Sequence, residues 1–461
     1  MDFEAEYGSI VANDKDVQEV LVKGREFRER YINPVADEID KKMLLDPHYF
    51  PDDIIKNGCD YGFLSLPIPE FIGGGGKTIL HSAILLEELC AGCSGIGNIF
   101  GAHYLGLSGL ILGMDINQYD RFLYEVVQKE KQGEPVIFSA AVTEPMAGTD
   151  VEDAEFLPKA KLMTFAKRVK GGYVLNGRKV FISNGSIAKY NVVICALEKD
   201  RPLETWTGFT IPADAKGFSA SRVELKMGQR AAHAAELVFD DCFVPRENRI
   251  GLEGKGMKMT EVILGASRAP VAAIATGIAR GAYERTLEFA KNRKSGAGRL
   301  IDKQWVQMAL ADMYAKIRIA RYSYLEAGKF FDDNITSSLM GHKMIINPVM
   351  RSLGIISRTG IGMKITSSDA FKKITTGYVE KKIKSALAYT SLGLSSLSKF
   401  SCADTAINVC LNALDIIGNE GAEERNIVEK YLRDAKLTQI YEGTNQLNRY
   451  TVYKKLIKGD Q

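Results

Sequence analysis

The sequence predicts an α+β protein in which an antiparallel β domain lies between two helical domains. Apolar residues recur at helical spacing through residues 1–133 and again from residue 251 to the end. Residues 134–250 instead contain short apolar runs separated by Gly, Asn and Asp turns. A length of 461 residues with 46% hydrophobic residues is enough for several globular domains. We predict an N-terminal helical domain (1–133), a middle β domain (134–250) and a C-terminal helical bundle (251–461).

The first domain contains helical patterns at Val17–Tyr31 and Ala83–Cys90. Between them, the run Gly73–Thr78 looks like a phosphate-binding loop. That loop requires Gly six residues before Lys77, and Phe71 stands there instead. We therefore interpret these glycines as a flexible turn between helices.

The stretch Leu89–Met114 carries no formal charge and is long enough to span a bilayer. It also contains seven Gly, together with Asn98 and His103. We interpret it as helices buried inside the protein.

Short apolar runs predict the strands of the middle domain, and longer stretches with helical spacing predict the helices of the C-terminal domain. The expected strands are Val136–Val142, Tyr173–Leu175, Val180–Ile182, Val192–Leu197, Gly208–Ile211 and Glu236–Phe239. The expected long helices are Gly256–Arg293, Ile301–Phe330 and Leu397–Ile417.

Composition excludes several classes of function. A net charge of +3 with only two Trp gives no sign of nucleic-acid binding. The seven scattered cysteines indicate reduced thiols, and the acidic N-terminus has no apolar signal segment, so we expect a cytoplasmic protein. Cys90 and Cys93 form a CxxC without a second pair, and the five His are far apart. We therefore predict no metal site.

Four separated segments stand out together. They are Ala141–Asp150 (AVTEPMAGTD), Asn176–Gly185 (NGRKVFISNG), Lys226–Arg230 (KMGQR) followed by Glu236–Asn248, and Tyr431–Lys436 (YLRDAK) leading into Gln439–Gln446 (QIYEGTNQ). In this order they resemble the acyl-CoA dehydrogenase family, and the resemblance covers the chain from about Gly58 to Lys455.

The resemblance implies FAD-dependent α,β-dehydrogenation of an acyl-CoA thioester to the 2-enoyl-CoA. That chemistry needs a base for the α proton, flavin N5 to take the β hydride, and donors on the thioester oxygen. The family's base is the Glu of its YEGT motif, here Glu442, with Gly443 leaving room for the thioester. Some members place the base in the other helical domain, at the position of Ser267, which cannot serve. Without that context, Glu442 would be read as a solvated loop carboxylate.

The middle domain is expected to hold the isoalloxazine ring. By resemblance, Thr143 and Thr149 contact the flavin, Gly148 permits close approach, and Thr149 also faces the substrate. Phe181 stands where a Trp usually packs against the ring, and Ser183 where a Thr usually meets the N5 region. The alternative for Phe181 and Ser183 is an ordinary alternating strand with Phe181 inward.

Other residues are carried over from the C-terminal motifs. Arg268 matches an Arg placed near CoA, and Arg293 one that reaches the FAD pyrophosphate of a neighbouring subunit, where a forked guanidinium suits two phosphate oxygens. The alternative for Arg293 is a solvated helix end. Three further residues are expected to contact FAD: Gly418, Thr444 and Gln446.

An insertion interrupts the C-terminal domain at about residues 334–384, where typical members have a short connection. Residues 341–385 contain nine Lys and Arg against two acids, so their charge is +7 in a chain of +3. Apolar residues are interleaved, and such a segment can contact anionic lipid at the inner face of a membrane or an acidic partner. The alternative is a solvated cover over the C-terminal helices.

The predicted protein is an acyl-CoA dehydrogenase, a homotetramer or homodimer that passes electrons to an electron-transferring flavoprotein. One rival is an acyl-CoA oxidase using oxygen, and another is a non-catalytic scaffold that binds CoA or a partner on the same fold. The acyl cavity is expected between Asn98 and Leu112, a segment without Arg. The sequence does not identify the acyl group.

Overall fold

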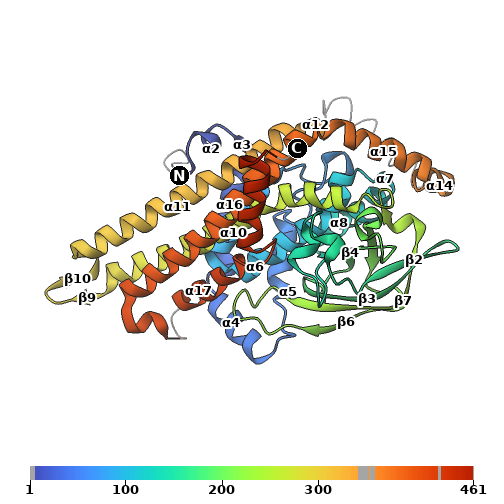
Figure 1. The fold of residues 1–461 in the computed structure, drawn as a ribbon. Helices are drawn as coiled ribbons and strands as arrows, with labels where there is room; N and C mark the ends of the chain where they lie inside the picture. Colours follow the sequence, from blue (N-terminus) through green and yellow to red (C-terminus); the bar gives the residue numbers. More distant parts are fainter. Residues whose placement is uncertain (1–5, 341–351, 353–358, 424–426, 460–461) are drawn as a thin grey trace.

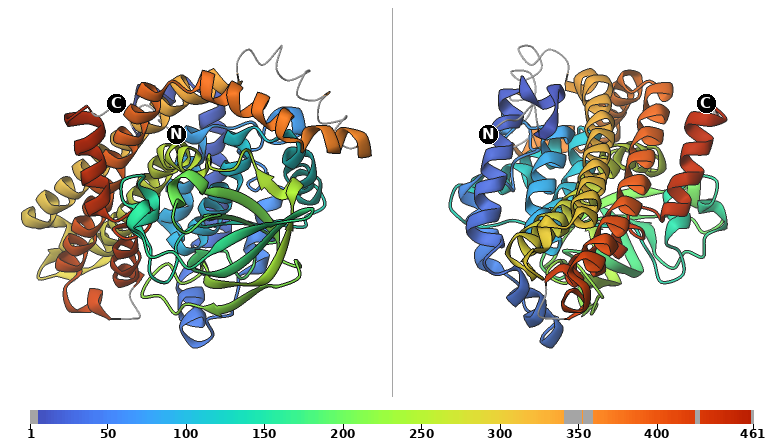
Figure 2. Two further views of the ribbon diagram at one scale, coloured as in Figure 1. Left: turned by 45° about the vertical axis from the view of Figure 1, so that its right-hand side comes forward. Right: turned by 90° about the vertical axis from the view of Figure 1, so that its left-hand side faces the viewer.

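Helices form both ends of the chain and strands its middle in the computed structural model, which describes residues 6–340, 352, 359–423 and 427–459. The β domain packs against one end of a long helical bundle (Figures 1 and 2). The N-terminal helices are Ser9–Ala12 (α2), Lys15–Phe27 (α3), Ala36–Leu45 (α4), Asp52–Asp60 (α5), Ile79–Gly113 (α6), Ile116–Gln118 (α7) and Tyr124–Glu130 (α8).

Helix α6 is two helices joined at a kink. Thr78 and His81 cap its start, with their side chains 2.8 Å apart. Cys93 has φ −155° and ψ 111°, which breaks the helical path. By length and composition α6, α10 (Gly256–Asn292) and the Ser385–Ala422 helix could each cross a membrane, but 94% of the most apolar part of α6 is buried in the fold.

The glycine run before α6 is closely packed against the chain that precedes it. Backbone N–H groups donate from Gly75 to Ser65 O (2.9 Å) and from Lys77 to Leu66 O (3.0 Å). A Cβ at Gly74 would lie 2.3 Å from a main-chain oxygen. Our interpretation of this run as a flexible turn is therefore wrong, since the glycines permit close backbone approach.

Two four-stranded sheets build the middle domain. One has the order β1-β4-β5-β8 and the other β2-β3-β7-β6. The strands are Phe138–Ala141 (β1), Phe165–Val169 (β2), Gly172–Ser183 (β3), Tyr190–Cys195 (β4), Thr207–Pro212 (β5), Phe218–Val223 (β6), Ala234–Pro245 (β7) and Arg249–Ile250 (β8). Leu175 and Leu237 of one sheet share a core with Val193 and Phe209 of the other.

The predicted strands differ from this domain in three respects. The runs at Tyr173 and Val180 belong to one strand, β3, and the strands β2, β6 and the two-residue β8 were missed. The ladders are antiparallel except for β1 and β4, which pair in parallel with Phe138 opposite Tyr190. The domain is therefore mostly, not wholly, antiparallel.

The C-terminal bundle consists of long helices with α10 at its centre, packed against α6 and α16. Besides α10 it contains Gln304–Phe331 (α11), Ser337–Met340 (α12), Ser385–Ile417 (α16), Ile427–Thr438 (α17) and Asn445–Val452 (α18). The hairpin of Lys294–Ser295 (β9) and Gly298–Arg299 (β10) lies at the bundle end away from the β domain (Figure 1). Helix α16 begins twelve residues before the predicted Leu397.

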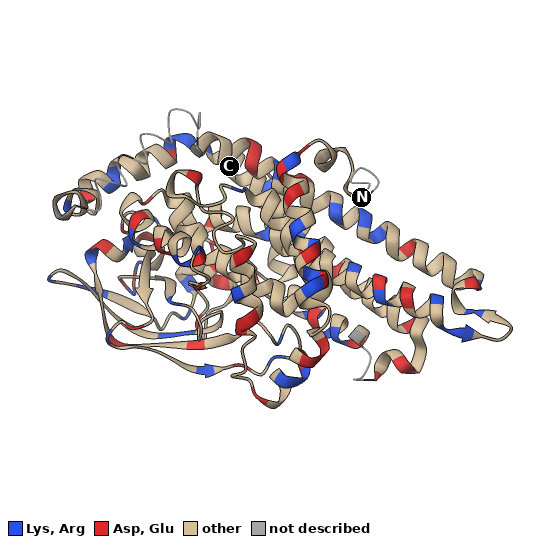
Figure 3. Ribbon diagram, turned by 180° about the vertical axis from the view of Figure 1, so that it is seen from behind, with Lys and Arg blue, Asp and Glu red and all other residues tan. Residues whose placement is uncertain are grey.

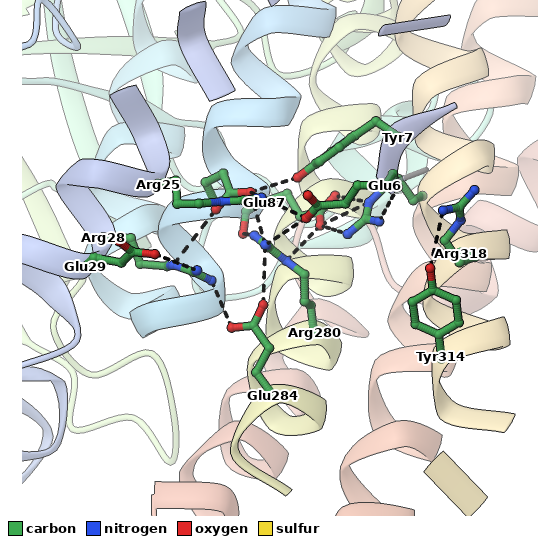
Figure 4. Close-up of polar contacts among 12 residues, drawn as sticks. Glu6, Tyr7, Arg25, Arg28, Glu29, Glu87, Arg280, Glu284, Tyr314 and Arg318 are labelled. Carbon is green, nitrogen blue, oxygen red and sulfur yellow. Dashed lines mark hydrogen bonds and ion pairs between the residues drawn. The ribbon is translucent and has the colours of Figure 1, made fainter. Parts of the chain in front are cut away.

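A buried ionic network ties α3, α6, α10 and α11 together (Figure 4). The Glu87 carboxylate of α6 accepts from Arg321 Nε at 3.0 Å and pairs with Arg280 Nε at 3.0 Å. Its neighbour Glu88 pairs with Arg280 Nη1 and with Arg25 Nη2, each at 3.0 Å. Burial alone would raise the pKa of Glu87, but the guanidiniums of Arg321 and Arg280 hold it below its ordinary value. These pairs fix the helices that carry the site.

Beyond α12, the described part of the insertion forms α14 (Gly360–Thr366) and α15 (Asp369–Lys382), which extend over the β domain from the top of the bundle (Figure 1). The apolar residues between 345 and 356 lie outside the described residues.

Charged side chains of α15 hold the insertion to the body. Asp369 accepts from Arg249 at 2.5 Å, and Glu380 pairs with the lysines at the N-terminal end of α10. Lys372 is 1% exposed and pairs with Asp115 at 3.0 Å. Lys372 is thus structural and does not belong to an exposed basic surface.

Candidate active site

The loop that carries Glu442 connects α17 to α18. Its backbone is left-handed at two successive residues, with φ 53° at Glu442 and 75° at Gly443. A Cβ at Gly443 would lie 2.8 Å from Glu152 Oε2 and 2.9 Å from Arg268 Nη2. Glycine is therefore required here both by conformation and by space. Thr444 closes the loop, because its hydroxyl accepts from the Leu447 N–H (3.2 Å) and caps α18.

The Glu442 carboxylate faces a cavity of about 630 Å³. Ser267 of α10 lies on the same wall, and its hydroxyl donates to Glu442 Oε2 at 2.6 Å. Among the described residues, the backbone N–H of Glu442 has no hydrogen-bond acceptor. The loop therefore presents one carboxylate and one free N–H.

Two buried cations hold the main chain of this loop. Arg268, 1% exposed, donates from Nε to Glu442 O (3.1 Å) and from Nη1 to Ser396 Oγ (2.8 Å). Lys399 of α16, fully buried, donates to Gly443 O at 2.6 Å. Burial and the nearby Arg268 charge lower the pKa of Lys399 to about 7.

A second carboxylate, Glu152, lies on the cavity wall beside the loop. Its Oε2 accepts from Arg268 Nη2 at 3.1 Å. Burial raises the pKa of Glu152 to about 7, because its effect exceeds the lowering by the Arg268 charge; the Glu442 carboxylate adds a smaller increase. Four ionisable groups thus meet at the base of the cavity.

The β domain contributes Phe181, Ser183 and Thr143 to the same cavity. Phe181 has φ 58° and lies at an irregularity in the β3–β7 pairing, which leaves its side chain 61% exposed. The alternative prediction of an inward Phe181 in a regular strand is therefore wrong. Within the described chain, the hydroxyls of Ser183 and Thr143 have no hydrogen-bond partner.

The segment that carries Thr143 is anchored from behind. Lys179 of β3 is fully buried and donates to Glu144 Oε1 at 2.8 Å and to Val142 O at 2.7 Å. A buried pair with satisfied hydrogen bonds fixes the backbone on both sides of Thr143.

The third and fourth motifs pack against each other. The Gln229 N–H donates to Asp434 Oδ1 at 2.5 Å, and Gln229 Nε2 donates to the Tyr441 hydroxyl at 3.2 Å. A Cβ at Gly228 would lie 2.4 Å from the main chain of Arg433. The KMGQR loop therefore positions the helix that leads to Glu442.

The remaining predicted residues lie outside the described cavity wall. Gly148 precedes and Thr149 begins the short turn that carries Glu152, and Gln446 is exposed in the first turn of α18. Arg293 stands about 39 Å along α10 from Ser267, at 1.5 Å per residue. There it pairs with Glu420, two residues after Gly418, at the far end of the bundle. Arg293 and Gly418 are thus together, but away from Glu442.

The segment from Asn98 to Leu112, which was expected to shape an acyl cavity, contributes to the wall of this cavity. Asn98, Gly101 and Leu105 of α6 line the cavity opposite Val271 and Ile274 of α10. This wall is mostly apolar, which suits a hydrocarbon group.

Comparison with known proteins identifies the family. Three profiles match the chain in order: the acyl-CoA dehydrogenase N-terminal domain over residues 14–130, the middle domain over 139–242, and the C-terminal domain over 254–345 and 380–457. The chain belongs to the acyl-CoA dehydrogenase family. The C-terminal match passes over residues 346–379, which lie within the predicted insertion.

Individual family members match over nearly the whole chain. The short-chain specific acyl-CoA dehydrogenase of Clostridium acetobutylicum is 30% identical over 94% of this chain and 96% of its own. The structure of butyryl-CoA dehydrogenase from Megasphaera elsdenii is 26% identical, with a TM-score of 0.74 over 95% of this chain and 97% of that one. A chain solved in work on the electron transferring flavoprotein of Acidaminococcus fermentans is 27% identical, with a TM-score of 0.74 over 96% and 98%. These matches confirm the predicted fold class and the predicted kind of enzyme, an oxidoreductase of a flavoprotein family.

Sequence reasoning missed two members of this acyl-CoA dehydrogenase site, Glu152 and Lys399. Lys399 is the only charged residue between Ser385 and Ala403, and that isolation in an apolar helix was a usable signal. Glu152 stands in an acidic stretch and carried no such signal.

Proposed function

We propose that this protein is an FAD-dependent dehydrogenase that converts an acyl-CoA thioester to the 2-enoyl-CoA. The observation that carries the proposal is that Glu442 and Phe181 line one cavity. A base from the helical domain and an aromatic face from the β domain then act on the same substrate from two sides.

The residues on the β-domain side fit a flavin. Phe181 offers an exposed aromatic face, and the free hydroxyls of Thr143 and Ser183 can bond ring heteroatoms. Arg293, Gly418, Thr444 and Gln446 are proposed contacts for other parts of FAD. When bound, FAD supplies the acceptor for the hydride that leaves the β carbon.

The chain's own residues would perform the proton transfer. Glu442 abstracts the α proton, and its hydrogen bond from Ser267 orients the carboxylate toward the cavity. The unpaired N–H of Glu442 is placed to donate to the thioester carbonyl oxygen, where negative charge develops.

The proposed partners are an electron-transferring flavoprotein and further copies of this chain, as a homotetramer or homodimer. The position of Arg293 supports the proposed homo-oligomer, because this residue lies far from Glu442 and is half-exposed at the end of α10. A residue there could reach a cofactor held by a neighbouring subunit.

Anaerobic mixing with a panel of acyl-CoA esters tests the function. We expect the purified protein to be yellow, to bleach with at least one ester, and to transfer electrons to an electron-transferring flavoprotein. Bleaching without transfer, but with rapid oxygen uptake, would favour an oxidase. A colourless protein that binds CoA without turnover would favour a scaffold.

We also propose that α14 and α15 contact an anionic membrane surface. Both acids of this pair of helices, Asp369 and Glu380, face the body, where they pair with basic residues. Four lysines of this segment remain exposed with three isoleucines, and Figure 3 shows Lys and Arg along these helices: Lys364, Lys373, Lys381, Lys382, Ile361, Ile365 and Ile374. Basic side chains with protruding apolar ones suit the surface of a bilayer, at about 1 kcal/mol per basic residue.

Co-sedimentation with vesicles tests this contact. The variant changes four exposed lysines to Gln: Lys364, Lys373, Lys381 and Lys382. The control makes the same charge change in exposed lysines of the β domain: Lys159, Lys161, Lys167 and Lys170. We expect the parent and the control to bind vesicles containing phosphatidylserine and the variant to lose binding. Equal sedimentation of all three would leave α14 and α15 as a structural cover.

A further inference from the structure

Glu152 is a partly buried carboxylate with no role in the chemistry described so far. It lies at the end of the turn Thr149–Glu152 and reaches the loop of Glu442 from the β-domain side. Its partner Arg268 bonds three groups at once: Glu152 Oε2, Ser396 Oγ and the main-chain oxygen of Glu442.

Glu152 is the ion-pair partner of Arg268. Arg268 is 1% exposed and bonds the main-chain oxygen of Glu442, and within the described residues its only ion pair is with Glu152. Lys399, whose pKa is lowered to about 7, bonds the main-chain oxygen of Gly443 and has Asp404 as a further nearby anion. Without an ionised Glu152, Arg268 would be left with the Glu442 carboxylate as the anion of this loop, since an uncompensated buried charge is costly. The base would then be drawn into an ion pair instead of remaining with Ser267.

We infer that Glu152 is a positioning residue: it occupies Arg268 Nη2 and thereby leaves the Glu442 carboxylate directed at Ser267 and the cavity. This inference rests on the proposed function of Glu442 as the base. The space at Gly443 supports it, since the loop leaves no room for another side chain between Glu152 and Arg268.

The ionisation of Glu152 makes its pairing with Arg268, and therefore turnover, depend on pH. Its pKa is raised to about 7 by burial and by the Glu442 carboxylate, so it is ionised above about pH 7 and neutral below. The other charged groups that face it are Arg268 from α10 and Lys399 from α16. We expect turnover to fall as the pH drops from 8 to 6, because neutral Glu152 holds Arg268 less firmly.

Stability provides a readout that is independent of turnover. A carboxyl whose pKa is higher in the folded state binds its proton more tightly there than in the unfolded chain. Its contribution to stability is present below the unfolded pKa, about 4.3, and is lost as the pH rises toward 7. Glu152→Gln should therefore be at least as stable as the parent at pH 8.

The experiment compares Glu152→Gln, Glu152→Ala and Glu152→Asp with Glu155→Gln, a more exposed acid of the same segment. We expect kcat to fall about ten-fold or more in Glu152→Ala and less in Glu152→Gln, with KM within about three-fold and bound flavin retained. The fall between pH 8 and 6 should be smaller in Glu152→Gln, where Lys399, with a pKa lowered to about 7, still changes its charge in this range. Glu152→Asp should restore part of kcat, and Glu155→Gln should match the parent.

Two outcomes would overturn the inference. One is a Glu152→Ala enzyme with the parent's kcat and pH profile. The other is a Glu152→Gln enzyme that is slower but also less stable at pH 8, which would indicate a merely structural role. A parent that reduces no acceptor with any acyl-CoA would instead reject the proposed function, while the stability comparison would still test the charge balance around Glu152.

Discussion

Ser267 donates its hydroxyl to Glu442 Oε2 at 2.6 Å, which joins the middle of α10 to the loop between α17 and α18. The resemblance to the family implies that the base can stand at either of these two positions. Both lie in the C-terminal bundle, so our expectation that the Ser267 position belongs to the other helical domain is wrong. Their side chains lie within one hydrogen bond of each other, so a carboxylate from either backbone can reach the same point in the cavity.

Moving the base tests this relationship. In Glu442→Gln, the additional change Ser267→Glu should restore part of the lost activity, because the new carboxylate arises next to the old one. We expect at least a ten-fold gain over Glu442→Gln alone in the rate of flavin bleaching by acyl-CoA. The matched control is Ser267→Gln in the same background, which adds the bulk without the charge. A gain of equal size in that control would show that the carboxylate is not responsible.

Arg293→Ala should weaken flavin retention more than chemistry. A charge-assisted hydrogen bond is worth roughly 1.5–3 kcal/mol, or about ten- to a hundred-fold in affinity. Flavin content after dialysis measures this. Arg299→Ala is the control, since Arg299 is also exposed and also pairs with an acid, Asp302. If both variants retain flavin like the parent, Arg293 is only a solvated helix end.

Glu87→Gln should destabilise the fold by about 3–5 kcal/mol, because it removes the carboxylate that pairs with the buried Arg321 and one of the carboxylates that pair with the buried Arg280. Chemical denaturation measures the difference. Glu284→Gln, whose side chain is 42% exposed, removes a partner of Arg28 and Arg280 at the edge of the same network. Its cost should stay below about 1 kcal/mol. An equal loss of unfolding free energy in the two variants would show that burial does not set the cost of removing a carboxylate from this network.

The sequence predicted those parts of the site that lie in continuous motifs. Glu442, Phe181, Ser183 and Thr143 were named from three short segments, and they meet at one cavity. The side-chain direction of Phe181 could not be read from alternation, because an irregularity in β3 turns it outward.

Contacts between distant residues were not predictable in the same way. Glu152 and Arg268 are 116 residues apart, and no local pattern marks their pairing. The same holds for Lys372, which was counted with the basic surface although Asp115 holds it inside. Composition gives the charge of a segment, but only the packing decides which charges face the solvent.

The role of Glu442 as the base is tested most directly by the rate of flavin bleaching when Glu442→Gln is mixed anaerobically with an acyl-CoA that the parent dehydrogenates. An amide cannot accept the α proton, so we expect the bleaching rate to fall by several orders of magnitude with flavin content unchanged. A variant that retains its flavin and more than about a tenth of the parent's rate would contradict the assignment of Glu442 as the base.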